Sequence, residues 1–205
     1  MNRSGGQYKL FDQSLGLPNG LLYRPDFITE EEEEMLIAFI QAIPLTRARV
    51  GEYTGKRRVK GFGWGWDYKN ERFIPGPPLP KFLGRFARKI AKWLHIPKDR
   101  VVEALVNEYT PGTALGWHRD NEKFEHVVGI SLSGWCHIQF RPLKNAQGRA
   151  KRAPAQNLSL ELEPRSAYVM QNDVRWRYQH RVASTKTLRY SITFRTLPAG
   201  GVVFK

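Results

Sequence analysis

The second half of the chain is a series of short apolar runs separated by turn-forming segments. The runs are rich in β-branched and aromatic residues, which favour extended structure. They cover Val101 to Tyr109, Val127 to Leu132, Trp135 to Phe140, Leu158 to Leu162, Ala167 to Met170, 175 to 183 and 187 to 196. Repeated short strands predict an α+β, mainly β fold with a jelly-roll core. The basic stretch Lys144 to Lys151 is then expected to be a loop between two strands.

Two helices are predicted in the first half. Thr29 and Glu32 have the spacing of a capping box, which marks a helix start. The apolar face of this helix is formed by Met35, Leu36, Phe39 and Ile40. In the segment from Pro80 to Leu94, apolar residues recur at helical spacing and basic residues occupy the other positions. Residues 1 to 20 have few apolar positions and are expected to form a flexible arm.

The last predicted strand alternates between two kinds of side chain. One face consists of Arg189, Ser191, Thr193 and Arg195, and the other of Leu188, Tyr190, Ile192 and Phe194. If the apolar face packs against the protein, two guanidinium groups point together into the interior. Unpaired charge there costs several kcal/mol, so the arginines need an anion. The alternatives are pairing with acids elsewhere on the sheet or a solvated polar face.

Composition is typical of one intracellular domain. The chain has 205 residues, of which 41% are apolar, and this is ample for a single core. Cys136 is the only cysteine, so no internal disulfide forms. The first residues lack the apolar run of a signal peptide, and no apolar stretch approaches the roughly 18 residues of a membrane span. We therefore expect an intracellular protein without a membrane segment or an obligate protein partner.

The chain is strongly basic. Its formal net charge is +14 and its pI is near 10.1. Such a charge attracts polyanions from a distance, with a strong dependence on salt, and nucleic acid is the obvious partner. By composition alone, a generic basic protein kept soluble by its charge, or one that binds acidic lipid, remains an alternative.

The candidate chemistry lies in His118-Arg119-Asp120 and in His180. On an extended segment His118 and Asp120 project to the same side, as two ligands of one ion must. His180 then has to arrive from a distant strand. Two histidines and one carboxylate with open metal positions is the arrangement of non-haem iron oxygenases. An HxD triplet alone is weak, but the paired arginines that follow His180 strengthen the iron hypothesis.

The spaced motifs of the final half resemble one family in their order. They are Asn107-Glu108-Tyr109-Thr110-Pro111-Gly112, His118-Arg119-Asp120, Gln179-His180 and the strand from Arg189 to Arg195. Together they are similar to the AlkB family of iron(II)- and 2-oxoglutarate-dependent dioxygenases. That family removes alkyl groups from nucleic-acid bases and some other substrates. The resemblance implies a double-stranded β-helix with the metal in its open mouth.

Ligands and organisation follow from the resemblance. It implies that His118, Asp120 and His180 bind iron(II), with 2-oxoglutarate and dioxygen as cosubstrates. A single domain is expected over 21–205. Within it, 21–100 would form helices and a nucleotide-recognition lid, and 101–197 the catalytic jelly roll.

The resemblance also implies how 2-oxoglutarate is held. Arg189 would bind its distal carboxylate by a bidentate salt bridge, assisted by Asn107 and Tyr109. Arg195 would lie near the metal-chelating end and the aspartate ligand. Ser191 is a departure, because many family members have asparagine between the two arginines. The shorter side chain leaves one hydrogen bond to water and is expected to alter cosubstrate affinity.

A basic and aromatic segment over 57–68 is predicted to be a substrate lid. Its glycines allow a loop to bend, and Trp64, Trp66 and Tyr68 offer faces on which a base can stack. Alternatively, one or two of the tryptophans anchor the loop in the core. Glu122 matches a position where relatives place an acid that faces the base, which would favour a cationic methylated base.

The predicted function is oxidative demethylation of nucleic-acid bases, with alkylated DNA carrying 1-methyladenine or 3-methylcytosine as the leading substrate. RNA or protein substrates remain alternatives, as does a catalytically silent nucleic-acid-binding module on the same fold. The paired arginines argue against a zinc hydrolase, since hydrolysis needs no dicarboxylate. His95, His126 and His137 have no carboxylate at ligand spacing and are predicted to be structural.

Overall fold

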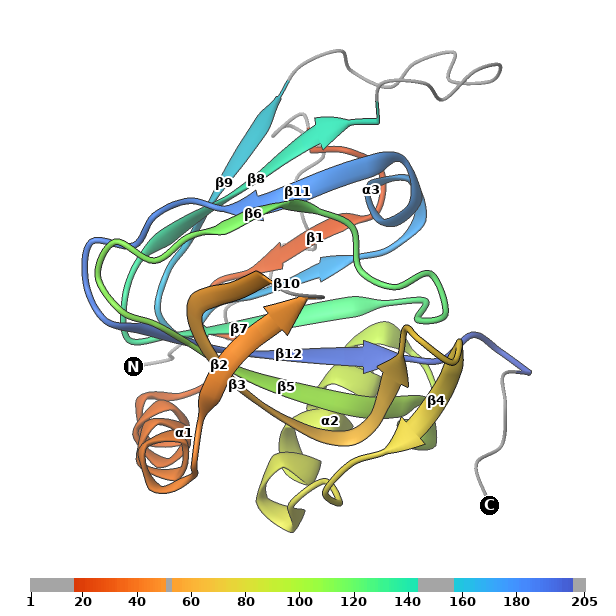
Figure 1. Cartoon of the computed structure of the whole chain (residues 1–205), viewed down its shortest axis with the longest axis horizontal. Coiled ribbons are helices and arrows are strands. Elements are labelled where there is room, and N and C mark those ends of the chain that lie inside the picture. Colours follow the sequence, from red (N-terminus) through yellow and green to blue (C-terminus); the bar gives the residue numbers. More distant parts are fainter. Residues whose placement is uncertain (1–16, 51–52, 144–156, 201–205) are drawn as a thin grey trace, which may run out of the picture.

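The computed structural model describes residues 17–50, 53–143 and 157–200. Two antiparallel sheets face each other (Figure 1). The larger has the strand order β1-β10-β7-β12-β5-β3-β2, with β4 paired to β3, and the smaller has the order β6-β11-β8-β9. The larger sheet contains β1 (Leu21–Arg24), β2 (Thr46–Val50), β3 (Tyr53–Asp67), β4 (Arg72–Pro75), β5 (Val101–Tyr109), β7 (Val127–Leu132), β10 (Ala167–Met170) and β12 (Arg189–Thr196). The smaller contains β6 (Leu115–His118), β8 (Cys136–Pro142), β9 (Leu158–Leu162) and β11 (Tyr178–Val182).

Two helices cover the outer face of the larger sheet (Figure 1). They are α1 (Glu30–Ala42) and α2 (Lys81–Leu94), which is followed by the 3-10 helix η2 (Lys98–Arg100). Thr29 and Glu32 form the predicted capping box at the start of α1. Leu36 and Ile40 of α1 pack with Phe86 and Ile90 of α2 in the same buried cluster as the central strands. Burying these faces stabilises the sheet that supports the site.

A second buried cluster lies between the sheets. Ile138, Phe140 and Leu162 of the smaller sheet pack with Val127 and Met170 of the larger one. The predicted strands that begin at 101, 127, 158, 167 and 187 are confirmed within two residues of their ends. The predicted run from Trp135 begins at Cys136, and Trp135 is 53% exposed.

Several expectations need correction. The segment from 57 is not a bending loop, because β3 pairs along its length with β5 and then with β4. The region 21–100 therefore contributes four strands in addition to its helices. Residues 175–177, predicted to be the first part of a strand, belong instead to a short helix, α3 (Asn172–Arg177). Leu188 is 40% exposed and precedes β12, so it is not part of the apolar face.

Two predicted segments lie outside the described residues. These are most of the proposed N-terminal arm and the loop Lys144 to Lys151. Among the described residues, no helix is long and apolar enough to cross a membrane.

A pair of glycine substitutions tests the packing within the larger sheet and on one of the helices that cover it. A Cβ on Gly129 of β7 would lie 2.3 Å from Cε1 of Tyr168 on the neighbouring strand, so Gly129→Ala is expected to lower the free energy of unfolding by about 1 to 3 kcal/mol. A Cβ on Gly84 in α2 would meet no atom within 4 Å. Because alanine favours the helix more than glycine does, Gly84→Ala is expected to raise the free energy of unfolding by about 0.5 to 1 kcal/mol. Urea unfolding of both variants measures the difference, and equal effects of the same sign would contradict this packing.

Candidate metal centre and cosubstrate cavity

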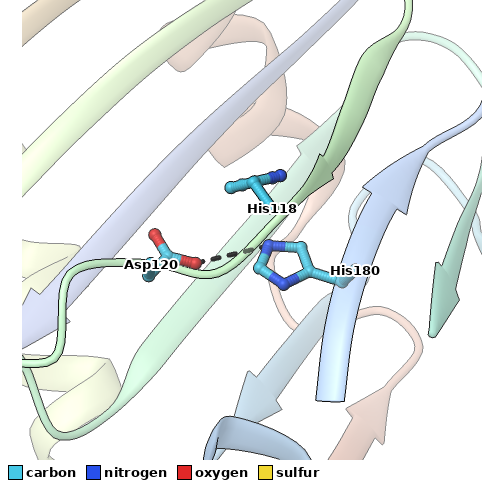
Figure 2. A group of neighbouring side chains, drawn as sticks. All are labelled: His118, Asp120 and His180. Carbon is cyan, nitrogen blue, oxygen red and sulfur yellow. Dashed lines mark ion pairs between the residues drawn. The ribbon is translucent and has the colours of Figure 1, made fainter. Parts of the chain in front are cut away.

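His118, Asp120 and His180 converge on one point although they are distant in sequence (Figure 2). His118 is the last residue of β6 and lies directly opposite His180 of β11 in the strand register. The two ring centroids are 4.2 Å apart. Asp120 follows two residues beyond His118 and closes the group from the connecting loop. Strand pairing therefore fixes the separation of the two imidazoles.

The geometry of the three side chains fits a metal ion. Their ligand atoms lie within 4.8 Å of one another, and His180 Nε2 is 3.3 Å from Asp120 Oδ2. His118 Nδ1 is 2.9 Å from the carbonyl oxygen of Gly116, so Nε2 of this ring is left for a metal. Among the described residues, no other cluster of three such side chains is found. Two imidazoles and one carboxylate are a donor set suited to iron(II).

Asp120 is held in place by a buried arginine. Arg195 Nε and Nη2 donate to Asp120 Oδ1 at 2.9 and 2.6 Å, while Nη1 donates to Glu103 Oε2 at 2.8 Å. Burial alone would raise the pKa of Asp120, but Arg195 and the two histidines outweigh it and hold this pKa below its usual range. Burial alone would lower the pKa of Arg195, and Glu103 and Asp120 raise it above its ordinary value. Asp120 is therefore ionised at neutral pH.

His180 is neutral at the same pH. Burial lowers the pKa of this imidazole to about 3, with further lowering by His118, Arg175 and Arg195 against the opposing effect of Asp120. A metal-ligating histidine must be neutral and a metal-ligating aspartate ionised. Both groups are therefore in the protonation state that binds a cation.

Arg175 of α3 anchors the loop that carries Asp120. It is 3% exposed, and its Nη2 donates to the carbonyl oxygens of Asn121 and Phe124 at 2.5 and 2.8 Å. Its Nη1 is 3.4 Å from the carbonyl oxygen of Asp120. Sequence reasoning missed this residue, because a strand was expected here and the contacts are to backbone atoms. Glu103 was also missed, although its alternation with Asn107 and Tyr109 along β5 indicates the same face.

Arg189 is suited to a dicarboxylate. It is 2% exposed, and its hydrogen-bond partner is the hydroxyl of Ser131, at 3.3 Å from Nε and 3.1 Å from Nη2. Its Nη1 is buried without a hydrogen-bond partner. Within the described parts of the chain, no carboxylate pairs with it, and the Tyr109 ring lies 5.2 Å from its Cζ. A buried, unpaired guanidinium is a binding point for an anion, and the residues fit 2-oxoglutarate.

One cavity joins the metal ligands to this arginine. Of the predicted cosubstrate residues, those that line it are Tyr109, Arg189, Ser191 and Arg195. Asn107 does not line the cavity, and its amide oxygen accepts a hydrogen bond from Arg57, which does. Arg57 and Tyr168 are wall residues that the sequence did not indicate.

The predicted substrate residues lie outside this cavity. Trp66 makes an edge contact with Phe73 of β4 at 4.9 Å, and Phe73 makes another with Phe124 at 5.6 Å. Trp64 is half-buried, and Tyr68 is 75% exposed in the turn after β3. Glu122 is exposed on the loop that follows Asp120. The ribbon formed by β3 and β4 thus packs against the metal-ligand loop, while contact of these four residues with a base stays a prediction.

The other histidines have structural positions. His126 Nδ1 is 2.8 Å from Thr196 Oγ1, and His95 caps the C-terminus of α2. His137 is exposed on β8. This agrees with their exclusion as ligands.

Acidification is expected to destabilise the metal-free protein. The pKa of His180 is about 3 in the folded state and ordinarily 6.5, so between these values the unfolded chain binds a proton that the folded chain does not. The stabilisation is complete above pH 6.5 and is lost as the pH falls, by about 1.4 kcal/mol per pH unit. Urea unfolding from pH 7 to 4.5 with a chelator measures this slope. His180→Gln is expected to flatten it, and identical slopes for both proteins would refute the assignment.

Comparison with known proteins agrees with the site. The sequence model of the 2OG-Fe(II) oxygenase superfamily matches residues 20–195. The alkylated DNA repair protein ALKBH8 homolog of Arabidopsis thaliana is 27% identical over 194 residues, which is 86% of this chain and 54% of that protein. The tRNA (carboxymethyluridine(34)-5-O)-methyltransferase ALKBH8 of Macaca fascicularis is 29% identical over 83% of this chain and 25% of its own length. The probable RNA/DNA demethylase ALKBH6 of Danio rerio is 28% identical, over 80% of this chain and 69% of that protein.

Solved structures show the same fold. OsALKBH1 superposes with a TM-score of 0.63 at 18% identity, covering 88% of this chain and 99% of its own. A Pseudomonas putida prolyl-4-hydroxylase superposes with a TM-score of 0.58 at 12% identity, covering 90% of this chain and 95% of its own. The predicted jelly roll is confirmed. The chain therefore belongs to the 2OG-Fe(II) oxygenase superfamily and is an iron(II)- and 2-oxoglutarate-dependent dioxygenase of the AlkB family.

Proposed function

We propose that this dioxygenase removes methyl groups from N-methylated nucleic-acid bases, with DNA carrying 1-methyladenine or 3-methylcytosine as the first substrate to test. When bound, iron(II) would activate dioxygen, which is the oxidant, and 2-oxoglutarate would supply two of the four electrons that the reduction of dioxygen needs while the methyl carbon supplies the other two. One oxygen atom enters the methyl group and the other enters succinate, with release of carbon dioxide. The N-hydroxymethyl group then breaks its carbon–nitrogen bond to give formaldehyde and the restored base.

The chain's own residues have separate tasks in this reaction. His118, Asp120 and His180 would hold the metal, and Arg189 with Tyr109 would hold the distal carboxylate of 2-oxoglutarate. Ionised Asp120 and neutral His180 keep the ligand set ready for the cation at neutral pH. The cavity is lined by residues of both sheets, so the metal ligands and Arg189 face the same space.

The observation that carries the proposal is the packing of the β3–β4 ribbon onto the metal-ligand loop. Phe124 lies four residues after Asp120, and the Cζ of Arg195 is 5.7 Å from its ring centroid. Trp66 reaches Phe124 through Phe73, and the ammonium group of Lys123 lies 5.8 Å from the Trp66 ring centroid. Aromatic and basic side chains therefore gather beside the site, as base stacking and phosphate contact require.

Charge and selectivity support the same substrate class. A net charge of +14 favours a polyanion over a neutral protein substrate. A base methylated on its pairing edge pairs poorly, so less free energy is needed to flip it out of a stack. Exposed Glu122 would favour the positive charge of such a base.

RNA is the second candidate substrate because of the relatives' names. One relative is named for alkylated DNA repair, one as a probable RNA/DNA demethylase and one as a tRNA methyltransferase. The chain spans about half the length of the first and a quarter of the third, so their whole activities do not transfer.

Mass spectrometry of matched DNA and RNA oligonucleotides bearing 1-methyladenine tests the proposal. With iron(II), 2-oxoglutarate and air, we expect loss of the methyl group together with equimolar formaldehyde and succinate. His118→Ala is expected to abolish turnover because one of the three ligands is lost. Succinate without methyl loss on either oligonucleotide would discard this substrate class, and a higher kcat/KM on RNA would select the second candidate.

Trp66 is expected to contribute to substrate binding. Stacking of a base on an aromatic ring is worth about 1 to 3 kcal/mol, so Trp66→Ala should raise the KM for the oligonucleotide about tenfold and leave the Kd for 2-oxoglutarate unchanged. Trp135→Ala removes an exposed tryptophan that precedes β8 and serves as the control. Steady-state kinetics measures the KM for the oligonucleotide in the wild type and in both variants. Equal KM values for wild type and Trp66→Ala would remove this residue from the substrate site.

A further inference from the structure

Two arginines and a tryptophan form a cluster on the outer face of the smaller sheet. The Cζ of Arg141 on β8 lies 4.4 Å from the ring centroid of Trp117 on β6, and the Cζ of Arg181 on β11 lies 4.9 Å from it. Side chains alternate along a strand, and the adjoining residues His118 and His180 face the metal centre. The cluster therefore lies on the back of the two strands that carry these ligands. The helices α1 and α2 cover the larger sheet and not this face (Figure 1).

Glutamines orient both guanidinium groups. The strand register puts Arg141 opposite Gln179 and Arg181 opposite Gln139. Arg141 Nε and Nη2 donate to Gln179 Oε1 at 3.0 and 2.8 Å, and Arg181 Nε donates to Gln139 Oε1 at 2.6 Å. In the described part of the chain, Arg141 Nη1 and both terminal nitrogens of Arg181 have no acceptor. A neutral amide thus fixes each group, does not compensate its charge and leaves donors for a ligand.

The two charges lie close together without an acidic partner. Because Gln179 is opposite Arg141 and two residues from Arg181, the arginines are diagonal neighbours on adjacent strands. Among the described residues, no carboxylate forms an ion pair with either of them. Like charges at this separation repel each other, and stacking on the indole of Trp117 offsets only part of the repulsion. An anion bound by both arginines would remove the rest.

A nucleic-acid strand is the anion that fits the cluster. Guanidinium groups stacked on an aromatic ring present planar forks of donors, which match the oxygens of a phosphate group. Two arginines on adjacent strands suit two neighbouring negative charges, which a polyanion offers and a single small anion does not. The net charge of +14 attracts polyanions from a distance, and the proposed substrate is one of them.

The cluster can be reached from the metal centre. Trp117 lies on β6, which among the described residues pairs with β11 alone, so the other edge of β6 is open. A hollow of about 260 Å³ is lined by Gly112, Ala114 and Gly116, from β6 and the segment before it, and shares Leu115 with the cosubstrate cavity. Their small side chains leave room for a strand to pass from the cavity over this edge to the outer face.

We propose that Arg141 and Arg181, stacked on Trp117, bind the phosphate backbone of the nucleic-acid strand away from the reacting base. The inward residues of β6 and β11 then hold the metal, while the outward residues of the same strands hold the rest of the substrate. The inference rests on the proposed nucleic-acid substrate and adds a second region of contact with it. A strand long enough to reach both regions would bind more tightly than a short strand with the same base.

Fluorescence anisotropy with the full chain loaded with manganese(II) measures this binding without turnover. The probes are labelled single DNA strands that bear 1-methyladenine, one of about five and one of about 20 nucleotides, with RNA strands of the same sequence as a second series. The double variant Arg141→Gln and Arg181→Gln is expected to raise the Kd of the long strand about tenfold and to leave the short strand within about twofold. Its salt dependence, as the slope of log Kd against log salt, should fall by about 1.4, because each phosphate contact contributes about 0.7.

A matched control removes two charges elsewhere. Arg88 and Lys92 are exposed on α2, which covers the other sheet, so the double variant Arg88→Gln and Lys92→Gln should match wild type. The double variant Arg141→Lys and Arg181→Lys keeps both charges and should restore the salt slope, but only part of the affinity, since lysine lacks the planar fork.

Trp117→Leu separates positioning of the arginines from general damage. It should raise the Kd of the long strand in the wild-type background and have less than about a twofold effect when both arginines are glutamine. Urea unfolding checks every variant, and the lysine pair replaces the glutamine pair if the latter is unfolded.

An unchanged Kd of the long strand in the glutamine double variant would overturn the proposal. Equal weakening of the short strand would also overturn it, because the arginines would then act through the metal centre. Failure of the proposed function has a different signature, since methylated strands would bind with the expected length dependence and keep their methyl groups under turnover conditions.

Discussion

The buried contact of Arg195 with Asp120 and Glu103 is the constraint on which the site depends. It joins β12, β5 and the loop after β6, three segments that meet only in the folded chain. Asp120 is 8% exposed, and a buried carboxylate without a partner would destabilise the fold by several kcal/mol. Because Arg195 compensates this charge, Asp120 can be ionised and fixed where the two imidazoles meet.

Three arginines that line the cavity and a fourth that holds the ligand loop differ in their partners, so residue type alone does not predict their roles. Arg195 is paired with acids, whereas Arg175 donates to backbone carbonyls of the ligand loop. Arg189 contacts a serine hydroxyl, and Arg57 contacts an asparagine amide. The first two hold the protein together, while the last two retain capacity for a ligand. The hydrogen-bond and ion-pair partners of each arginine, which are set by tertiary packing, distinguish the structural arginines from those that can bind a ligand.

Some of this arrangement was predictable from sequence, for physical reasons. A strand alternates its side chains, so the pattern from 187 to 195 predicted that Arg189 and Arg195 share the inner face, and the structure confirms it. Convergence of His118, Asp120 and His180 followed from their residue types and the family resemblance. The structure of the segment from 57 was harder to predict, because glycines and aromatics suit both a loop and a strand. Pairing with β5 and β4, which the local sequence does not show, makes it a strand. No local signal marks the anchoring role of Arg175, because the side-chain hydrogen bonds that hold the ligand loop are all long-range.

The position of β6 has a consequence for the protein without its metal. This strand has only four residues and, among the described residues, pairs on one side only, with β11, in a register that shifts after His180. Such an edge strand has few backbone hydrogen bonds and belongs to the part of a fold that opens first. Since His118 and His180 lie on the two partner strands, an ion bound by both is a cross-link between them. Metal binding would then stabilise β6 at the edge of the smaller sheet. The degree to which β6 is ordered would therefore report the fraction of the protein that has metal bound.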